Sequence, residues 1–179
     1  MTLGYVGLIM ALQFDGRYEM KQILWTKVLL TVYKKLPKMV QLLDNARDNL
    51  IKTGLGVVYN RWHMTNEELF DKMISLNYRR LGLINAKVLV DEGIRRLPER
   101  LRGAIIARFF TEDLDGYAKE CGICMRTAFK RVESAIEKLA EIFKNLGYGE
   151  KKLNLEYKDE PLLTKVGKRL EILYYSKSS

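Results

Sequence analysis

Apolar residues recur at spacings of three and four along much of the chain, which is the pattern of amphipathic helices. Residues 20–53 show it first, and Pro37 is expected to kink or divide this segment before Gly54 and Gly56 end it. A loop is expected to continue through residues 60–64. The apolar positions of the first segment are Ile23, Leu24, Val28, Leu29, Val32, Leu36, Val40, Leu43 and Leu50.

A second, longer helix is predicted from a capping box at its start. The Thr65 hydroxyl can accept a hydrogen bond from the amide of Glu68, while the Glu68 side chain can accept one from the amide of Thr65. The helix runs to Arg96, with Gly82 and Gly93 as weak points. The apolar residues of this helix form a stripe along one side. This stripe could pack against the first helices or against a second copy of the chain, and both options stay open. The stripe consists of Leu69, Met73, Leu76, Leu83, Ile84, Val88 and Ile94.

Pro98 marks a predicted domain boundary, because proline disfavours continuing one helix and is tolerated in the first turn of the next. We therefore divide the chain into an N-terminal helical region at 1–96, a domain at 97–147 and a tail at 148–179. Residues 1–19 are an extension if translation starts at Met20.

The tail is predicted to hold a short helix and has one ambiguous segment. Leu153, Leu155 and Tyr157 alternate with polar residues, as in a short strand. The last helix is expected to start around Pro161 and to end near Tyr175. The predicted fold class is all-α.

Residues 113–145 predict two helices joined by a tight corner. Asp113 is a good N-cap for a short helix. Gly122 follows where a helix ends in left-handed geometry, which glycine adopts at little cost. Cys124 then takes the cap position of a second helix, which shows no breaker. This is the spacing of a helix-turn-helix.

The packing of these two helices can also be predicted. Ala118 and Ala128 are small where the helices cross, and Ile123 can plug the turn. Cys121 is expected to be a buried apolar filler. A shared core is expected from Ile105, Ile106, Phe109, Phe110, Val132, Ala135, Ile136, Leu139 and Phe143.

The start of the second helix is expected to be exposed and basic. Met125, Arg126, Phe129 and Lys130 lie on its outer face, with Arg131 beside them, and the segment contains no acid. A helix N-terminus adds partial positive charge that favours phosphate. The alternative is an ordinary helical hairpin with a basic edge.

The motif domain resembles region four of bacterial sigma factors over residues 95–142. The likeness rests on a leucine-proline-glutamate-arginine start, an arginine-aromatic pair, the glycine-containing turn and several helix positions. These anchors are Leu97, Pro98, Glu99, Arg100, Arg108, Phe109, Tyr117, Ala118, Gly122, Ile123, Arg126, Thr127, Arg131 and the run from Ala135 to Leu139.

The resemblance implies that the second helix enters the major groove of the minus-thirty-five promoter element. Arg126 and Lys130 would then reach bases and phosphates, and Arg126 is the best base-reading candidate because arginine commonly pairs with guanine. Arg102 and Lys119 would contact the DNA backbone. RNA polymerase is an implied partner. The predicted DNA-binding set is Met125, Arg126, Thr127, Phe129, Lys130, Arg131, Arg102 and Lys119.

Residues 1–96 show no recognisable promoter-melting region, since the tryptophans and tyrosines are scattered. A sigma-like transcriptional regulator is therefore favoured over a complete sigma factor. The N-terminal helices would serve for packing, homodimerisation or partner binding.

The net charge of +9 suits a polyanionic partner, but it is unevenly spread. It amounts to +6 over residues 1–96, +1 over 97–147 and +2 over 148–179. The low charge of the motif domain favours the alternative of a non-catalytic interaction module. Such a module would bind RNA polymerase, another protein or structured RNA.

The two cysteines and single histidine restrict the chemistry. Cys121 and Cys124 form a C-x-x-C pair, but zinc would need two further ligands, and His63 is the only histidine. A redox switch at Cys124, through a lowered pKa at a helix N-terminus, is an alternative. No P-loop, dinucleotide-binding loop or nucleophile elbow is present, so we expect no enzyme activity and no cofactor.

The expected compartment is the cytoplasm, because two cysteines provide no disulfide framework. Residues 3–12 are apolar but too few to span a bilayer, and no positive region precedes them as in a signal peptide. We therefore expect no membrane association.

Overall fold

The computed structural model describes residues 21–56 and 65–175, with an all-α fold and no strand among these residues. The predicted loop at residues 60–64, with Trp62 and His63, lies outside the described residues, as do residues 1–19 and Met20. The chain divides into two compact units. One is Tyr33–Leu89, and the other combines Met1–Val32 with Val90–Ser179.

The Tyr33–Leu89 unit contains a break in the first predicted helical segment. The short 3-10 helix η1 (Tyr33–Lys35) precedes α2 (Leu36–Gly56), so Pro37 lies in the first turn of α2, where its missing N–H costs little. The expected division near Pro37 and the end at Gly56 are confirmed. An ion pair of 2.7 Å between Arg80 Nε and Asp44 Oδ1 joins α3 to α2.

Helix α3 (Asn66–Arg96) starts at the predicted capping box. The amide of Glu68 donates to Thr65 Oγ1 at 3.2 Å, and the amide of Thr65 donates to Glu68 Oε2 at 3.0 Å. The two bonds satisfy amides that lack partners within the helix. The predicted start and end of this helix are confirmed.

The predicted apolar stripe of α3 is only partly right. Leu83 is fully buried, but Val88 is 59% exposed. The buried positions of this stretch also include Leu89, together with Ala86 and Val90, which share the opposite face of the helix from Val88. Helix α3 carries apolar residues on two faces, so the three-and-four pattern alone did not identify the buried one.

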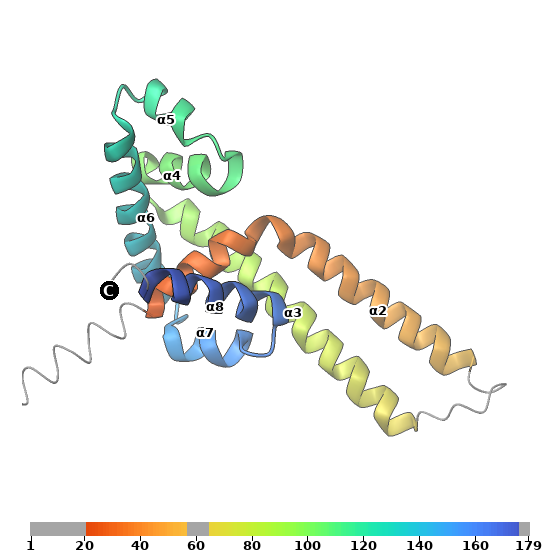
Figure 1. The fold of residues 1–179 in the computed structure, drawn as a ribbon. Coiled ribbons are helices and arrows are strands. Elements are labelled where there is room, and N and C mark those ends of the chain that lie inside the picture. The colour runs from red at the N-terminus through yellow and green to blue at the C-terminus, as the bar shows by residue number, and fades with distance from the viewer. Residues whose placement is uncertain (1–20, 57–64, 176–179) are drawn as a thin grey trace, which may run out of the picture. The chain divides into compact units, whose positions relative to one another are not determined.

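The second unit is built around one long helix, α6 (Met125–Asn145). Helices α4 (Glu99–Ile105) and α5 (Leu114–Glu120) pack against α6 (Figure 1), and the π-helical segment η2 (Ile106–Thr111) continues α4. Sequence periodicity did not predict this π-helical segment. Helices α7 (Glu150–Tyr157) and α8 (Pro161–Tyr175) complete the unit together with the helix over residues 21–32 and the end of α3.

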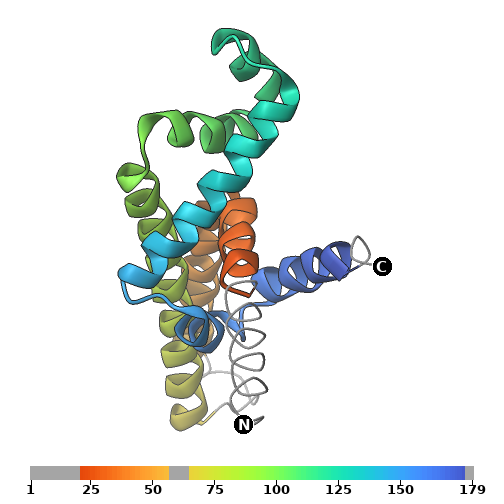
Figure 2. The same cartoon turned by 90° about the vertical axis from the view of Figure 1, so that its left-hand side faces the viewer.

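The core of this unit lies along one side of α6, which Figure 2 shows running through the unit from one end to the other. Gly93 of α3 permits close packing there, because a Cβ added at this glycine would lie 2.5 Å from Phe143 Cε1 and 3.0 Å from Leu139 Cδ2. The buried side chains of α6 are Ala128, Val132, Ala135, Ile136, Leu139, Ala140, Ile142 and Phe143.

The strand expected around Leu153 and Tyr157 is wrong, because these residues belong to helix α7. Both side chains are fully buried, whereas Leu155 is 71% exposed. Positions 153 and 157 are one helical turn apart, so the same residues satisfy a helical period as well as an alternating one. The last predicted helix is confirmed as α8, which starts at Pro161.

Candidate nucleic-acid interface

The corner between α5 and α6 has the geometry that the sequence predicted. Gly122 adopts a left-handed backbone with φ of +61°. The amide of Ile123 donates to the Ala118 carbonyl at 2.9 Å, and the amide of Gly122 donates to the Lys119 carbonyl at 3.1 Å. These two bonds form a Schellman motif, which closes the C-terminal end of α5 and turns the chain toward α6.

Helix α6 then begins directly after the corner. Cys124 is its N-cap, with extended backbone geometry and no side-chain bond to the helix amides. The Cys124 carbonyl accepts from the amides of Thr127 and Ala128 at 2.9 and 3.0 Å. The predicted boundaries of both helices are confirmed, and the first turns of α6 protrude from the unit beside α5 (Figure 1).

The start of α5 is fixed by an aspartate cap. Asp113 Oδ1 accepts from the amide of Gly116 at 2.7 Å, as the sequence predicted. A Cβ at Gly116 would collide with this carboxylate. Glycine at this position therefore preserves the cap that sets the direction of α5.

Tyr117 connects three helices, a role that the sequence did not reveal. Its hydroxyl donates to the Arg100 carbonyl of α4 at 2.9 Å and accepts from Arg131 Nη1 of α6 at 3.1 Å. A Cβ at Gly103 would lie 3.0 Å from the Tyr117 ring, so the absence of a side chain there makes room for it. This clamp holds α5 in a fixed position against the first half of α6.

The outer face of the first two turns of α6 carries two cationic and two apolar side chains. Arg126 and Lys130 are exposed, as predicted, and within the described residues neither forms an ion pair or a side-chain hydrogen bond. Met125 is 37% exposed and Phe129 is 46% exposed. We call these four residues the α6 face.

The four other predicted contact residues have partners within the protein, and that of half-buried Thr127 is the Cys124 thiol. Arg131 is half-buried in the Tyr117 clamp. Arg102 Nη2 donates to the carbonyls of Arg95 and Leu97 at 3.0 Å each, which caps the end of α3. Lys119 Nζ lies 2.5 Å from Asp115 Oδ2, in an exposed pair that leaves the ammonium accessible. Their contacts with DNA stay predictions.

Arg108 extends the basic surface, although the sequence did not place it in the site. Its guanidinium carbon lies 6.0 Å from the centre of the Phe129 ring, and its side chain is exposed. A guanidinium over an aromatic ring is held by cation–π attraction. Only the packing of η2 beside α6 brings these two residues together, so no local motif could have indicated it.

Some predicted core positions near the corner are wrong. Cys121 is exposed, because it is the C-cap of α5 and lies where the chain turns outward. Phe109 is only half-buried, as are Ile106 and Phe110, while Ala104, Ile105 and Ala107 are buried. The remaining predicted core residues of this domain are confirmed as buried: Ile105, Val132, Ala135, Ile136, Leu139 and Phe143.

Cys124 is exposed at the start of α6 and shares a hydrogen bond with a neighbouring hydroxyl. Its Sγ lies 3.2 Å from Thr127 Oγ1. This side-chain hydrogen bond, together with nearby backbone amides, lowers the pKa of the Cys124 thiol. The suggested redox role of Cys124 stays a prediction.

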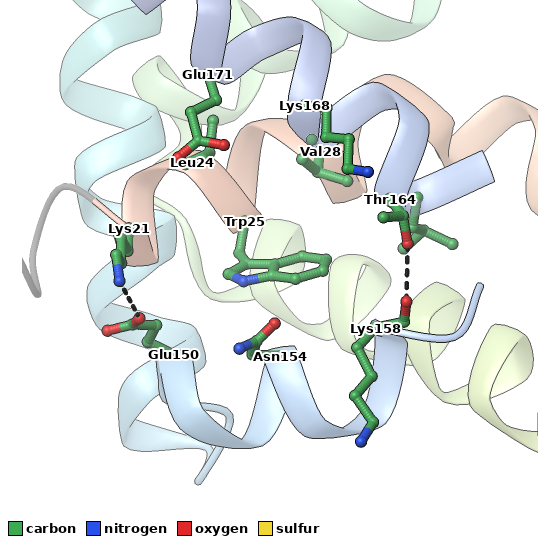
Figure 3. A pocket seen from close by; sticks show the side chains of 12 residues that line it. Lys21, Leu24, Trp25, Val28, Glu150, Asn154, Lys158, Thr164, Lys168 and Glu171 are labelled. Atoms are coloured by element: carbon green, nitrogen blue, oxygen red, sulfur yellow. Dashed lines mark hydrogen bonds and ion pairs between the residues drawn. The ribbon is translucent and has the colours of Figure 1, made fainter. Parts of the chain in front are cut away.

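A small cavity elsewhere in the same unit does not define a second site. It measures about 240 Å³ and lies between the helix over residues 21–32, α7 and α8. Figure 3 shows the Trp25 indole between Asn154 and Lys168. The charged lining side chains are of both signs, and Lys21 Nζ already lies 3.5 Å from Glu150 Oε1. This cavity therefore identifies no ligand class.

Across residues 21–56 and 65–175, no group of three or more His, Cys, Asp or Glu side chains could hold a metal ion. None of the helices described in these ranges is long and apolar enough to cross a bilayer.

Comparisons with protein-family models, characterised proteins and solved structures find no match to this chain. The resemblance to sigma region four therefore stays a prediction from the sequence.

Proposed function

We propose that the protein is a sigma-like transcriptional regulator that binds duplex DNA through the α6 face. The observation that supports this most is the exposure of Arg126 and Lys130 on the first turns of a helix that follows a tight corner. A helix of this kind fits the major groove, with its N-terminal residues toward the base edges.

Three members of the α6 face have a chemical role in this proposal. Arg126 donates two hydrogen bonds to guanine, while Lys130 approaches a phosphate. Phe129 provides an apolar surface for the methyl group of thymine. Arg108 adds charge beside Phe129, and the Tyr117 clamp keeps the face rigid, so less ordering is needed on binding.

The first experiment is selection of bound duplexes from a random pool, followed by titration of the selected sequence at several salt concentrations. Binding should weaken steeply with salt, because lysine and arginine release counterions from phosphates. Lys130→Ala should weaken binding to all sequences evenly and reduce the salt slope by about one. Lys138→Ala is the control, since Lys138 lies farther along α6 in a pair with Glu141.

A non-catalytic interaction module is the second candidate. The exposed Met125 and Phe129, in a motif domain of net charge +1, support a protein partner such as RNA polymerase. A pull-down against polymerase, run beside a gel shift with duplex DNA, separates the two. Polymerase capture without any duplex binding would favour the interaction module and reject the DNA-binding proposal.

A further inference from the structure

We infer that a cluster of lysines on the Tyr33–Leu89 unit binds the phosphate backbone of duplex DNA without reading its sequence. This surface consists of other residues than the α6 face, so the inference does not depend on base reading by Arg126. The cluster lies on η1, the first turn of α2 and the part of α3 that contacts η1. We call it the lysine patch, and its members are Lys34, Lys35, Lys38 and Lys87.

The sequence concentrates positive charge in the segment that carries most of this patch. Residues 21–43 contain five lysines and no acidic residue, so this segment contributes +5 to the formal net charge of +9. The motif domain contributes only +1, and α7 and α8 together balance six cations against five carboxylates. A polyanion is therefore attracted more strongly to this segment than to the motif domain or to the last two helices.

Two lysines of the patch are free to bind phosphate. Lys35 and Lys38 are exposed, and within the described residues neither forms an ion pair or a side-chain hydrogen bond. The carboxylates of α2, Asp44 and Asp48, pair with arginines instead. The other acidic residues of this unit lie in the first two turns of α3 and are Glu67, Glu68 and Asp71.

Helix α3 adds the fourth lysine of the patch. Lys87 Nζ lies 5.5 Å from the centre of the Tyr33 ring, so cation–π attraction holds the ammonium beside η1. The ion pair between Arg80 and Asp44 joins α3 to α2 seven residues before Lys87 and six residues after Lys38. These two contacts place Lys87 and Lys38 on the same end of the pair of helices.

The chemistry of the patch fits phosphate better than base edges or lipids. All four cations are lysines, whose compact ammonium approaches a phosphate as a point charge and lacks the planar fork of arginine. Leu36, which lies among them, is fully buried and offers no side chain for insertion among lipids. Phosphate contacts of this kind position a protein on a duplex, whereas base contacts specify the sequence.

The salt dependence of binding to a duplex of random sequence tests the inference with the full chain. Fluorescence anisotropy at several salt concentrations gives the slope of log affinity against log salt. The double variant Lys35→Ala/Lys38→Ala should reduce the size of this slope by about two, because each phosphate contact contributes nearly one. The matched control Lys52→Ala/Lys72→Ala should leave the slope unchanged.

The control removes the same charge from the other end of the same unit. Lys52 and Lys72 are exposed, and each lies eight residues from the ion pair of Arg80 and Asp44, on the side away from the lysine patch. Circular dichroism should show full helix content in both double variants, because none of the four substituted side chains is buried.

Photo-crosslinking tests whether the patch contacts the duplex directly. The background carries Cys121→Ser and Cys124→Ser, which removes both native thiols, so that a maleimide crosslinker attaches only to an introduced cysteine. A crosslinker at Lys38→Cys should capture the duplex on illumination, whereas one at Lys52→Cys should not. Capture from position 52 but not from position 38 would overturn the inference.

Three further results would overturn it. One is an unaltered chain that binds no random duplex, and another is an equal slope for the two double variants. The third is a Lys35→Ala/Lys38→Ala protein that loses binding to phosphatidylserine vesicles but keeps its affinity for the duplex. Failure of the α6 face would look different, because Arg126→Ala would then leave the affinity for a selected duplex unchanged while Lys35→Ala/Lys38→Ala still reduces the slope.

Discussion

Helices α6 and α3 use apolar residues in different ways. In α6, the apolar side chains after its second turn are gathered on one buried side, and only Met125 and Phe129 near its start are exposed. In α3, apolar residues occupy two sides, of which one is buried and the other is exposed. A helix with one apolar side specifies one packing surface, whereas a helix with two can pack internally and still present a surface for association.

The largest expected effect tests the buried side of α6. Phe143 is fully buried, so Phe143→Ala should lower the free energy of unfolding by about 3–5 kcal/mol through lost burial and a cavity. Phe129→Ala, at the exposed start of the same helix, should change it by less than about 0.5 kcal/mol. Urea unfolding measures both, and equal losses would show that α6 does not have one buried side.

The next effect tests the point where the two helices meet. Gly93→Ala should lower the free energy of unfolding by about 1–3 kcal/mol more than Gly167→Ala does. Both glycines lie within helices, so the gain in helix propensity cancels. A Cβ at Gly167 meets only Val28 Cγ2 at 3.7 Å, in ordinary contact, whereas at Gly93 it collides with Phe143. Equal stability of the two variants in urea titrations would contradict the close packing of Gly93 against Phe143.

A smaller effect is expected at the corner that precedes α6. Gly122→Ala should cost about 1–2 kcal/mol, because a side chain is disfavoured in left-handed geometry. Gly167→Ala is the control, since Gly167 has no positive φ and a Cβ there would make only ordinary contact with Val28. Thermal unfolding of the two variants should differ accordingly, and an unchanged Gly122→Ala protein would argue against the tight corner.

The smallest effect concerns the C-terminal end of α3. Arg95 and Arg96 hydrogen-bond the Glu92 side chain and lower its pKa to about 2. Because the folded state lowers the pKa of Glu92, its carboxylate stabilises the fold fully at pH values above its ordinary pKa of 4.5. This contribution decreases below pH 4.5 and disappears as the pH falls through about 2. Glu92→Gln should therefore lower the melting temperature slightly at pH 7, and by progressively less from pH 4.5 downward. A difference independent of pH would contradict this account.

The comparison of α3 and α6 also shows how much the sequence could predict. Local signals identified several features that depend on neighbouring residues, such as the Thr65 capping box, the Asp113 cap and the corner at Gly122. Because α6 has a single apolar side, the sequence pattern also predicted its buried positions. Prediction was wrong at Val88 because the two apolar sides of α3 produce overlapping periods.

Features that depend on tertiary packing were not predictable in this way. The Tyr117 clamp and the Arg108–Phe129 contact each join residues on different helices, and nothing in the local pattern indicates them. The buried pair Leu153 and Tyr157 fits two periods equally well, so burial against the rest of the unit decides in favour of a helix. For the candidate site, the sequence predicted the exposed cations but not their surroundings.

The central claim is that Arg126 reads duplex DNA from the start of α6. The most direct measurement is the dissociation constant for a duplex selected from a random pool, determined by fluorescence anisotropy for the unaltered chain and for Arg126→Ala. The account predicts a loss of about 1–3 kcal/mol for Arg126→Ala, together with relaxed sequence preference. Arg169→Ala, an exposed arginine on α8, should bind like the unaltered chain. Equal affinities for the unaltered chain and Arg126→Ala would contradict the claim.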